Sequence, residues 1–439
     1  MTVSTIEEWR NSDTMLDFHA GWHTNFPWNR RWDEPRQGEE FVYFHRQFLA
    51  WYTAERIARG LSMVLDWKSD DPIPEAHTNQ NGTNRPQNWS IPGPLQSSFE
   101  IPSWFTRAGH PTNSYTDNQS VNVPSTNFRK LSDFPNVDVL GKALEHPLHN
   151  MGHGAMGGMF RIGDVRGDMA TVGNAPRDPF FFMWHRLIDN IWREWSELPD
   201  VTLPQPNPLP VTIRNGNESN ATNSPDIIIR RTRVGDPASE LGDFDNLDIE
   251  SDSVHYGQTA YLYARLENNS NQDVSGTVHF FYAPMSLAMN RRYWVEIPSN
   301  NAGRWGTRIH LGSNEKQVIR SGPMPGTIVW NSQFVPAPNN YRLLVMMLPD
   351  NAPLGYPFER ALPPNSTVEN LVLDNTWMAW RDFIVEDPST TNNNSDSSSN
   401  VDVQAILDRV LELYNQGVLT RDQVIQILQM LADRGLITL

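Results

Sequence analysis

The stretch DPFFFMWHRLIDNIWREW, residues 178–195, carries the clearest structural signal in the chain. Its apolar residues recur every three or four positions, which is the period of one face of an α-helix. Asp178 followed by Pro179 is typical of a helix start, because Asp caps free N–H groups and proline suits the first turn. The residues on the shared face are Phe181, His185, Ile188, Trp192 and Trp195. We therefore predict a helix over 179–196 that buries one histidine.

A second amphipathic stretch covers residues 41–59 and also places one histidine on its apolar face. The residues on that face are Phe41, Phe44, His45, Phe48 and Tyr52. Residues 1 to about 200 are therefore expected to be mainly helical. Between the two helices, residues 68–140 are rich in Pro, Asn, Ser and Gly, which predicts a long irregular excursion.

From about residue 205 the sequence changes to short β-rich runs separated by turn residues. The runs are DIIIRRTRV, TAYLYARLENNS, GTVHFFYAP, TRIHLG, TIVWNSQFV and NYRLLVMML. This pattern predicts an antiparallel β-sandwich. The closing segment NTWMAWRDFIVED resembles the last strand of immunoglobulin-like accessory modules.

The last part of the chain begins with the polar segment PSTTNNNSDSSSN, which has too few apolar residues to fold. Residues 401–439 follow as two amphipathic helices broken at 415–417. They resemble hairpin modules that mediate self-association, and docking on the same chain is an equal alternative. We thus expect a multidomain α+β protein with a helical-bundle domain (1–204), an immunoglobulin-like β-sandwich (205–387), a linker (388–400) and a C-terminal helical hairpin (401–439).

Composition excludes several classes of partner and of metal site. The 439 residues include 35 Lys+Arg and 51 Asp+Glu, for a formal charge of -16, which repels nucleic acid and anionic membrane surfaces. No apolar run reaches the length of a membrane span and no signal peptide is visible, so we expect a cytoplasmic protein unless a partner assists its export. The absence of cysteine excludes disulfides, zinc ribbons, iron–sulfur clusters and thiol nucleophiles.

Six of the twelve histidines follow a doubled pattern. His19 and His23 stand four apart in FHAGWH, a spacing that points two imidazoles the same way on a helix. His149 and His153 repeat this spacing in HNMGH. Each pair is followed by the lone histidine of one of the two helices above, His45 and then His185. The sequence therefore predicts two three-histidine sites.

Ligands that are all imidazole favour copper or zinc. The bridging carboxylates of di-iron bundles and the HExxH motif of zinc proteases are missing, although a three-histidine catalytic zinc stays open. The repetition favours copper, since two facing trios leave open positions where O2 can bridge. The competing interpretation is that single buried histidines are hydrogen-bonded core residues. We assign that kind of local or surface role to the other six, which are His77, His110, His146, His255, His279 and His310.

The segments FVYFHRQFLAWYTAERIARG, HPLHNMGHG and RDPFFFMWHRLIDNIWREW resemble the tyrosinase, hemocyanin and phenoloxidase family of type 3 dinuclear copper proteins, and especially its arthropod-type members. The resemblance covers residues 15–60 and 141–196. It implies two copper ions that cycle between Cu(I) and Cu(II), with O2 as co-substrate. It assigns His19, His23 and His45 to one copper, and His149, His153 and His185 to the other.

The resemblance also implies two catalytic residues, Glu145 and Asn150, which would hold a water that deprotonates a monophenol. The alternative for Glu145 is a position near the start of a helix opened by Pro147, where the helix dipole favours an acid. Gly154 leaves the pocket mouth open to substrate.

Other matches and departures concern the surroundings of the metals. Asp189 would orient imidazoles by hydrogen bonding, while Arg46 and Arg186 pair with carboxylates of the bundle. Because only eighteen residues precede His19, we expect no counterpart of the large N-terminal domain of arthropod relatives or of its shielding side chain. The cysteine–histidine thioether of some relatives is impossible here.

These observations predict a copper-dependent polyphenol oxidase, of the tyrosinase or catechol oxidase type. It would oxidise o-diphenols to o-quinones and act as a monooxygenase on monophenols. An o-aminophenol oxidase that forms quinone imines, a hemocyanin-like oxygen carrier, and a metal-free binding module are the alternatives. The expected partners are a small phenolic or aminophenolic substrate, a copper-delivery protein, and a second copy bound through the C-terminal helices.

Overall fold

The computed structural model describes residues 3–26, 35–64, 131–150, 152–153, 167–201, 203, 207–216, 223–298, 305–319, 328–358 and 367–389, with six single residues of the tail. The chain divides into two compact units, Met1–Pro388 and Ser389–Leu439. The predicted boundary near residue 204 falls inside the first unit and stays a prediction. Most of the predicted linker and hairpin lies outside the described residues.

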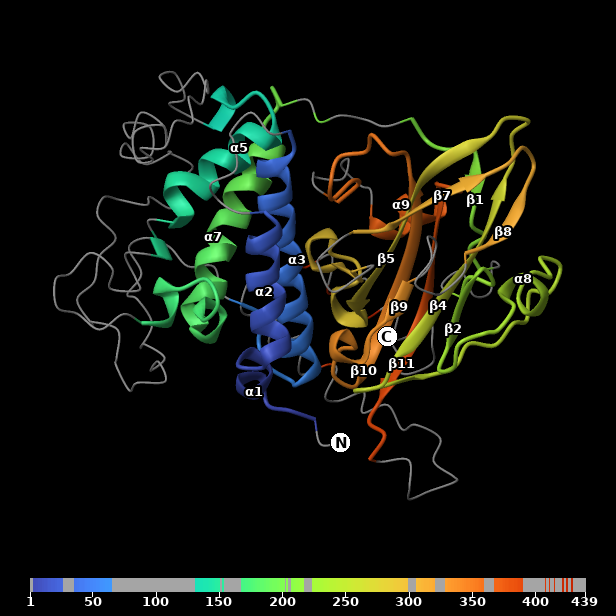
Figure 1. Cartoon of the computed structure of the whole chain (residues 1–439), viewed down its shortest axis with the longest axis horizontal. Helices are drawn as coiled ribbons and strands as arrows, with labels where there is room; N and C mark the ends of the chain where they lie inside the picture. The colour runs from blue at the N-terminus through green and yellow to red at the C-terminus, as the bar shows by residue number, and fades with distance from the viewer. Residues whose placement is uncertain are drawn as a thin grey trace. The chain divides into compact units, whose positions relative to one another are not determined.

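The helices that precede the β-rich half gather on one side of Figure 1. They are α1 (Ile6–Arg10), α2 (Asp13–Asn25), α3 (Gln37–Ala58), α5 (Val137–Ala143) with a π-helical continuation (Leu144–His149), and α7 (Pro179–Ser196). The predicted helix at 179–196 is confirmed together with its cap, because Asp178 Oδ1 accepts a hydrogen bond of 2.9 Å from Phe180 N. The helix predicted at 41–59 begins four residues earlier, at Gln37. Among the described helices, none is long and apolar enough to cross a membrane.

The predicted irregular excursion at 68–140 was wrong at its end. Residues Val137–Ala143 form α5, and its start is capped by Asn136, whose Oδ1 accepts from Val139 N at 2.9 Å. The earlier part, to residue 130, lies outside the described residues. Pro147 does not open a helix, since the backbone is already helical from Val137 and continues through Pro147 as a π-helical turn. Proline lacks an N–H, so a locally wider turn is a common way to keep it inside a helix.

Helices α3 and α5 touch through two glycines. A Cβ placed on Gly141 would lie 1.9 Å from the Gly38 carbonyl oxygen, and one on Gly38 would lie 2.0 Å from the Asp138 carbonyl oxygen. The backbones therefore approach as closely as only glycine allows. Gly38 N also donates to Asp138 Oδ1 at 2.8 Å. These contacts fix α5, and with it the turn that carries His149, against α3.

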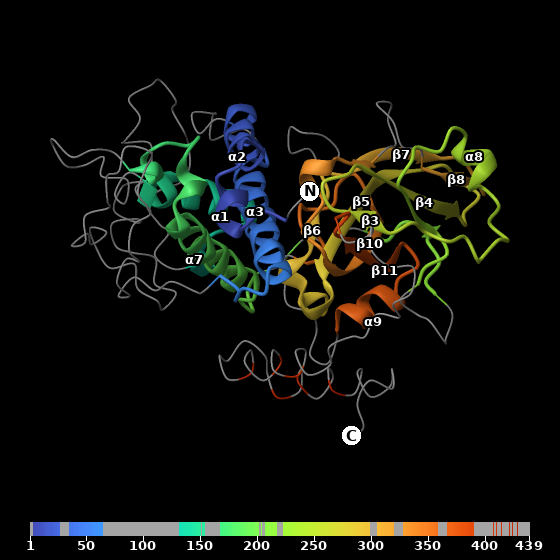
Figure 2. The ribbon, with the colours of Figure 1, turned by 90° about the horizontal axis from the view of Figure 1, so that it is seen from below.

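The β-rich half contains two sheets (Figures 1 and 2). The five-stranded sheet consists of β1 (Val211–Thr212), β2 (Ile227–Arg230), β4 (Ala260–Asn268), β8 (Lys316–Val318) and β9 (Ile328–Trp330). The six-stranded sheet consists of β3 (Val254–His255), β5 (Val274–Pro284), β6 (Val295–Glu296), β7 (Thr307–Leu311), β10 (Asn339–Leu348) and β11 (Met378–Glu386). Each predicted run, and the closing segment, contains a strand.

Pairing in the two sheets is antiparallel with one exception. Central strands β5 and β10 pair with Leu344 opposite Phe281, whereas β3 runs parallel to β11. The expectation of a wholly antiparallel domain was therefore wrong at that edge. The elements that join strands are α8 (Pro237–Glu240), α9 (Val368–Leu373) and the 3-10 turns Met285–Leu287, Arg291–Tyr293 and Ser332–Phe334. Three further 3-10 turns, Leu131–Asp133, Asp168–Ala170 and Ala175–Arg177, lie between the helices.

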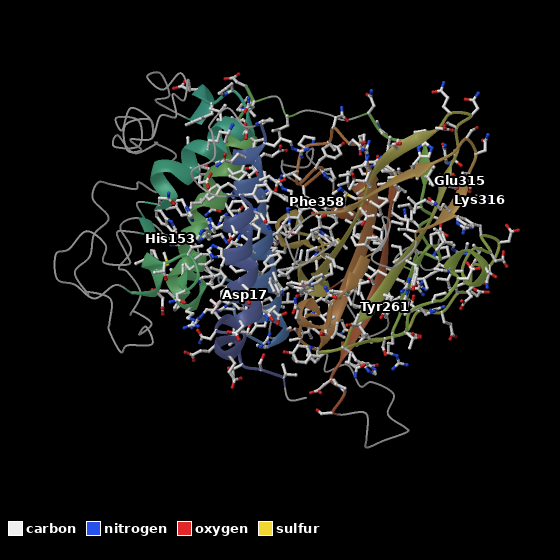
Figure 3. The ribbon with its side chains drawn as sticks, viewed as in Figure 1. Asp17, His153, Tyr261, Glu315, Lys316 and Phe358 are labelled. Atoms are coloured by element: carbon white, nitrogen blue, oxygen red, sulfur yellow. The ribbon has the colours of Figure 1, made fainter. Side chains whose placement is uncertain are left out.

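Helices and sheets share one apolar core. A single cluster of buried side chains contains Phe48 of α3, Phe181 of α7, Leu262 of β4 and Val345 of β10. The mixed α+β class is thus confirmed, while the immunoglobulin-like comparison stays a prediction. Figure 3 shows how the side chains fill both halves, with His153 labelled among the helices and Phe358 beside the sheets.

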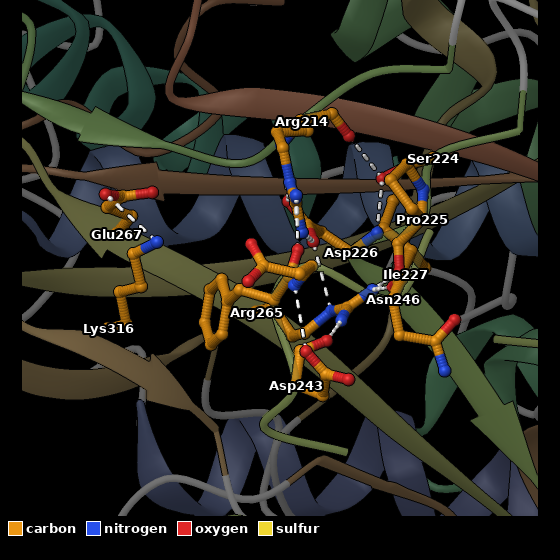
Figure 4. A network of polar contacts seen from close by, with 12 residues as sticks. Arg214, Ser224, Pro225, Asp226, Ile227, Asp243, Asn246, Arg265, Glu267 and Lys316 are labelled. Carbon is orange, nitrogen blue, oxygen red and sulfur yellow. Dashed lines mark hydrogen bonds and ion pairs between the residues drawn. The ribbon is translucent and has the colours of Figure 1, made fainter. Parts of the chain in front are cut away.

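A buried polar network holds the five-stranded sheet (Figure 4). Arg265 on β4 is fully buried, and its Nε lies 3.1 Å from Asp226 Oδ1. Arg214 binds the same carboxylate, with Nη2 to Oδ1 at 2.6 Å, and Arg265 Nη2 donates to Pro225 O at 2.6 Å. The two guanidinium groups satisfy a buried carboxylate, which would otherwise be costly.

Candidate metal centre

The six predicted histidines come from four neighbouring elements. His19 and His23 lie on α2, His45 lies on α3, and His185 lies on α7. His149 ends the π-helical turn, and His153 follows it in helical backbone.

The histidine rings meet as one cluster. The possible ligand atoms of His19, His23 and His45 lie within 4.8 Å of one another, and so do those of His45, His149 and His185. The rings of His45 and His185 stack with centroids 4.5 Å apart. The two trios are therefore adjacent, which the dinuclear hypothesis requires.

His153 takes a slightly different place from the one predicted. The second group of close ligand atoms contains His45 in its place. Nevertheless, the centroid of the His153 ring lies 4.4 Å from that of His149 and 5.4 Å from that of His185. The structure thus brings all six predicted residues together, with His153 at the edge of the second trio.

Hydrogen bonds at Nδ1 orient most of these rings. Four imidazoles use main-chain carbonyl oxygens as acceptors: His45 with Phe41 (2.8 Å), His185 with Phe181 (2.7 Å), His19 with Val172 (3.0 Å) and His153 with Met169 (2.9 Å). A carbonyl oxygen can only accept, so each Nδ1 carries the proton and each Nε2 carries a lone pair. This arrangement is the usual support for a histidine that binds a metal.

The Nε2 atoms lack the partners that buried polar atoms normally have. Those of His19, His45 and His153 are buried and make no hydrogen bond to any residue that the structure describes. The Nε2 atoms of His149 and His185 lie 3.1 Å apart. His149 Nδ1 donates to Asn150 Oδ1 at 3.2 Å, so both of these Nε2 atoms present lone pairs. Facing lone pairs are stabilised by a cation between them.

Burial keeps the imidazoles neutral. It lowers the pKa of His45 to about 3 and that of His153 to about 4. Burial, reinforced by the neighbouring imidazoles, lowers the pKa of His19, His149 and His185 well below the ordinary value. Neutral imidazoles with free Nε2 lone pairs are the form that binds metal. The donor set therefore fits two ions that prefer nitrogen ligands, of the copper or zinc kind.

Aromatic rings enclose the cluster. The centroid of Phe181 lies 3.9 Å from that of His185 and 5.0 Å from that of His19. Phe41 lies 4.9 Å from His149 in the same measure, and Trp22 lies 5.3 Å from His45. Such walls exclude water and strengthen electrostatic interactions inside the site.

Glu145 is buried in the turn that ends at His149. Its side chain is 1% exposed, and Gln37 Nε2 donates to its Oε2 at 3.2 Å. Its Oε1 is buried and has no hydrogen-bond partner among the described residues. Burial raises the pKa of Glu145 to about 8, although Gln37 and Lys142 oppose the shift. Gly154 lies outside the described residues.

The expected role of Asp189 was wrong. Its carboxylate binds guanidinium groups instead of imidazoles: Oδ1 lies 2.6 Å from Arg46 Nε, and Oδ2 lies 2.6 Å from Arg292 Nη2 and 3.5 Å from Arg186 Nη1. Burial alone would raise the pKa of Asp189, but the three cations hold it well below its usual range. The predicted pairing of Arg46 and Arg186 with a carboxylate is confirmed. Because Arg292 follows β5, this cluster joins the bundle to the β-rich half.

The other described histidines have local partners. His255 Nε2 lies 3.3 Å from Glu386 Oε2, His310 Nε2 lies 3.6 Å from Asp273 Oδ2, and His279 Nδ1 lies 2.5 Å from Glu296 Oε1. His77, His110 and the side chain of His146 lie outside the described residues. Gln37 was not predicted as a site residue. Its signal in the sequence is weak, since it stands four residues before Phe41, which in turn stands four residues before His45.

Comparisons with known proteins agree with this centre. Residues 9–192 match the family model described as hemocyanin, copper containing domain. Over 329 residues the chain is 25% identical to the hemocyanin AA6 chain of Androctonus australis, and the match covers 64% of this chain and 50% of that protein. Over 216 residues it is 30% identical to phenoloxidase 8 of Anopheles gambiae, and the match covers 40% of this chain and 29% of that protein.

The fold comparison extends over more of the chain. A scorpion hemocyanin in its activated state matches with a TM-score of 0.54 and 19% identity, over 88% of this chain and 76% of that one. The chain spans about half or less of the length of the two curated relatives named above. Residues 9–192 are therefore similar to the copper-containing domain of hemocyanins, and the chain's relatives include both hemocyanins and phenoloxidases.

Proposed function

We propose that this protein is a copper-dependent oxidase that uses O2 to convert o-diphenols to o-quinones and to hydroxylate monophenols. The observation that carries the proposal is Glu145, a buried carboxyl group with an unpartnered oxygen in the turn that leads to His149. A group that only supports the fold would have its polar atoms satisfied. An oxygen carrier has no need of a base at this place.

The histidines would hold the metals. His19, His23 and His45 would bind one copper, and His149, His153 and His185 the other. Two copper ions would supply the changes between Cu(I) and Cu(II) by which O2 oxidises a phenol. The Nδ1 hydrogen bonds of His19, His45, His149, His153 and His185 keep these rings from rotating, and the aromatic wall keeps bulk water away from the reacting atoms.

Glu145 would accept the phenolic proton at Oε1. A general base works best when its pKa lies near the working pH, and burial brings the pKa of Glu145 to about 8. The positive charge of Lys142 favours the carboxylate form of Glu145, and the hydrogen bond from Gln37 does the same. Asn150 accepts from His149 Nδ1, so we assign it the positioning of that imidazole as well as the predicted water.

The test is to load the full chain with copper, measure metal per chain by mass spectrometry, and follow O2 consumption with a monophenol, an o-diphenol and an o-aminophenol. We expect two copper ions per chain and turnover of the diphenol and the monophenol. Glu145→Gln should lower monophenol turnover about a hundredfold, the usual size of a general-base contribution, and spare diphenol turnover. The matched control is Glu250→Gln, at an exposed position of the β-rich half.

Each alternative has its own result. Reversible, stoichiometric O2 uptake without phenol consumption would identify a carrier. Turnover of the o-aminophenol alone would identify a quinone-imine-forming oxidase. Stable binding of zinc in preference to copper, or of no metal at all, would refute the oxidase. Equal losses of monophenol and diphenol turnover in Glu145→Gln would refute the base assignment.

A further inference from the structure

A separate cavity of about 470 Å³ lies between α3 and the six-stranded sheet. Gln37, Glu40 and Tyr43 of α3 line one side, and His279 and Phe281 of β5 line another. None of the six predicted metal ligands is among the described residues that line it. Its volume falls within the range of roughly 300–1,000 Å³ that is typical of small-molecule sites. It is large enough for a compact organic ligand.

Among the ionisable groups that line this cavity, the carboxyl group of Glu40 has no ion-pair partner within the described residues. The other ionisable groups of its lining each have a side-chain partner: Arg36 Nε lies 3.0 Å from Glu39 Oε2, His279 Nδ1 lies 2.5 Å from Glu296 Oε1, and Asp350 Oδ2 lies 2.6 Å from Arg308 Nη2. Tyr43 Oη donates to the second oxygen of Glu296. When Glu40 is ionised, the cavity favours a cation.

Two hydrogen-bond acceptors of the cavity lining are unsatisfied. Glu40 Oε2 and Gln37 Oε1 are buried and have no partner within the described ranges. They belong to residues three positions apart on α3, so they lie on adjacent points of one helix face. Unpaired buried acceptors are costly, and a ligand that carries several N–H donors would satisfy both. Burial raises the pKa of Glu40 to about 7, although Arg36 and the side chain of Trp305 oppose the shift, and a further cation at Oε2 would favour the carboxylate form.

The remaining lining is aromatic and apolar. The aromatic members are Phe26, Tyr43, Phe281, Trp305 and Tyr356. Tyr43 and Trp305 meet edge to face, with ring centroids 5.3 Å apart. Aromatic faces attract ammonium groups and bury apolar bodies, so this lining suits a cation attached to a hydrocarbon frame better than an inorganic ion.

We propose that this cavity binds a small organic ammonium ion with an aromatic or aliphatic body. The ammonium group donates to Glu40 Oε2 and Gln37 Oε1, and the body packs against Trp305 and Phe281. This site uses no metal and none of the histidine cluster, and the one residue that it shares with the oxidase proposal is Gln37.

The experiment uses benzylammonium as the probe, with benzyl alcohol and benzoate as its neutral and anionic counterparts. Binding to the full chain is measured by titration calorimetry, with and without copper. We expect saturable binding of benzylammonium with the same affinity in both forms, and much weaker binding of the other two. Glu40→Gln should weaken benzylammonium binding by at least about tenfold, as expected for the loss of a charged hydrogen bond, and leave benzyl alcohol unchanged. Glu250→Gln is the control.

Two further results decide the proposal. Ala352 lines the cavity, so Ala352→Trp should fill it and abolish benzylammonium binding even if Glu40→Gln folds poorly. Affinity that appears only with copper would place the probe on the metals and overturn the proposal. Absence of saturable binding, or undiminished binding by both variants, would overturn it as well. None of these results depends on whether phenols are oxidised.

Discussion

Gln37 Nε2 donates to Glu145 Oε2 at 3.2 Å, which joins the first residue of α3 to the turn before His149 across 108 positions of sequence. The bond stabilises the ionised carboxylate and leaves Oε1 for another partner. Gln37 also lines the separate cavity, and its own Oε1 has no hydrogen-bond partner among the described residues. One side chain therefore contacts both the proposed catalytic base and the proposed ammonium site.

Removing this bond should change the pH profile of monophenol hydroxylation. Gln37→Leu deletes a donor that lowers the pKa of Glu145, so that pKa will rise. Less carboxylate will be present at neutral pH, and the rising limb of monophenol kcat/KM will move to higher pH while the diphenol profile stays in place. In a Glu145→Gln background, Gln37→Leu should have no further effect on the monophenol. If the rising limb of the monophenol kcat/KM profile does not move, Gln37 does not influence the pKa of the catalytic base.

Copper content should depend on His185 and not on His310. His185 Nε2 faces that of His149, whereas His310 is an exposed residue of β7. Metal analysis of His185→Ala should give one copper per chain or fewer, and His310→Ala should keep two. Thermal unfolding should show that copper raises the stability of the wild type by mass action and raises that of His185→Ala much less. Full copper occupancy in His185→Ala would contradict the proposed ligand set.

The metal-free protein should lose stability as the pH falls from 7 to 5.5. Unfolded histidines take up protons near the ordinary pKa of about 6.5, but buried His45 does so only near pH 3 and His153 near pH 4. Unfolding therefore binds protons, and each such histidine lowers the free energy of unfolding by up to about 1.4 kcal/mol per pH unit in this window. Urea titrations at several pH values measure the slope. Glu145 and Glu40, whose folded pKa values burial raises to about 8 and about 7, oppose part of this slope, so a net slope of the opposite sign would contradict neutral buried imidazoles.

Asp189→Asn should be strongly destabilising. It leaves Arg46, Arg186 and Arg292 without their shared carboxylate, and the loss of one partner of a buried ion pair costs about 3–5 kcal/mol. Because the folded pKa of Asp189 is depressed, its contribution is complete above about pH 4 and declines as the pH falls toward the folded value. The gap between wild type and variant in urea titrations should narrow in acid. Exposed Asp17→Asn is the control, and equal stability of the two variants would refute the assignment.

The glycine contact between α3 and α5 offers a paired test. Gly141→Ala places a Cβ 1.9 Å from the Gly38 carbonyl oxygen, so the helices must separate, at a cost of about 1–3 kcal/mol. Because α5 leads to His149, copper content should fall too. Gly21→Ala on α2 meets nothing within 4 Å and should be neutral or stabilise by about 0.5–1 kcal/mol. Unchanged metal content in Gly141→Ala would show that His149 is positioned independently of this contact.

The sequence predicts the elements better than their connections. The four-residue steps of the histidines and the apolar faces around His45 and His185 were enough to predict that six imidazoles converge. Alternating apolar runs likewise predicted the strands. The acceptors at Nδ1 could not be predicted, because four of them are main-chain carbonyls such as that of Val172, which no residue type identifies.

Pairings between residues far apart in the sequence could not be predicted either. Glu145 meets Gln37, and Glu296 meets His279 and Tyr43, only after helices and sheets have packed. Asp189 lies one turn after His185, which suggested an imidazole partner. Its carboxylate instead accepts a hydrogen bond from Arg292, which is 103 residues away in the sequence. Sequence spacing reports neighbours on one element and says little about which element lies opposite.

Helix α3 gives His45 to the cluster, Arg46 to the carboxylate of Asp189, Gln47 to the backbone of β6, and Glu40 to the cavity. Each residue of a helix is turned by about 100° from the one before it. Inserting one alanine ahead of Glu40 would spin Gln37 and Gly38 out of phase with the rest of α3, and inserting it after Gln47 would leave all these roles in phase. The rotation per residue of α3 thus fixes the directions in which its side chains reach the metal centre, the cavity and the sheet, so a shift in register at one of these sites changes its alignment with the other two.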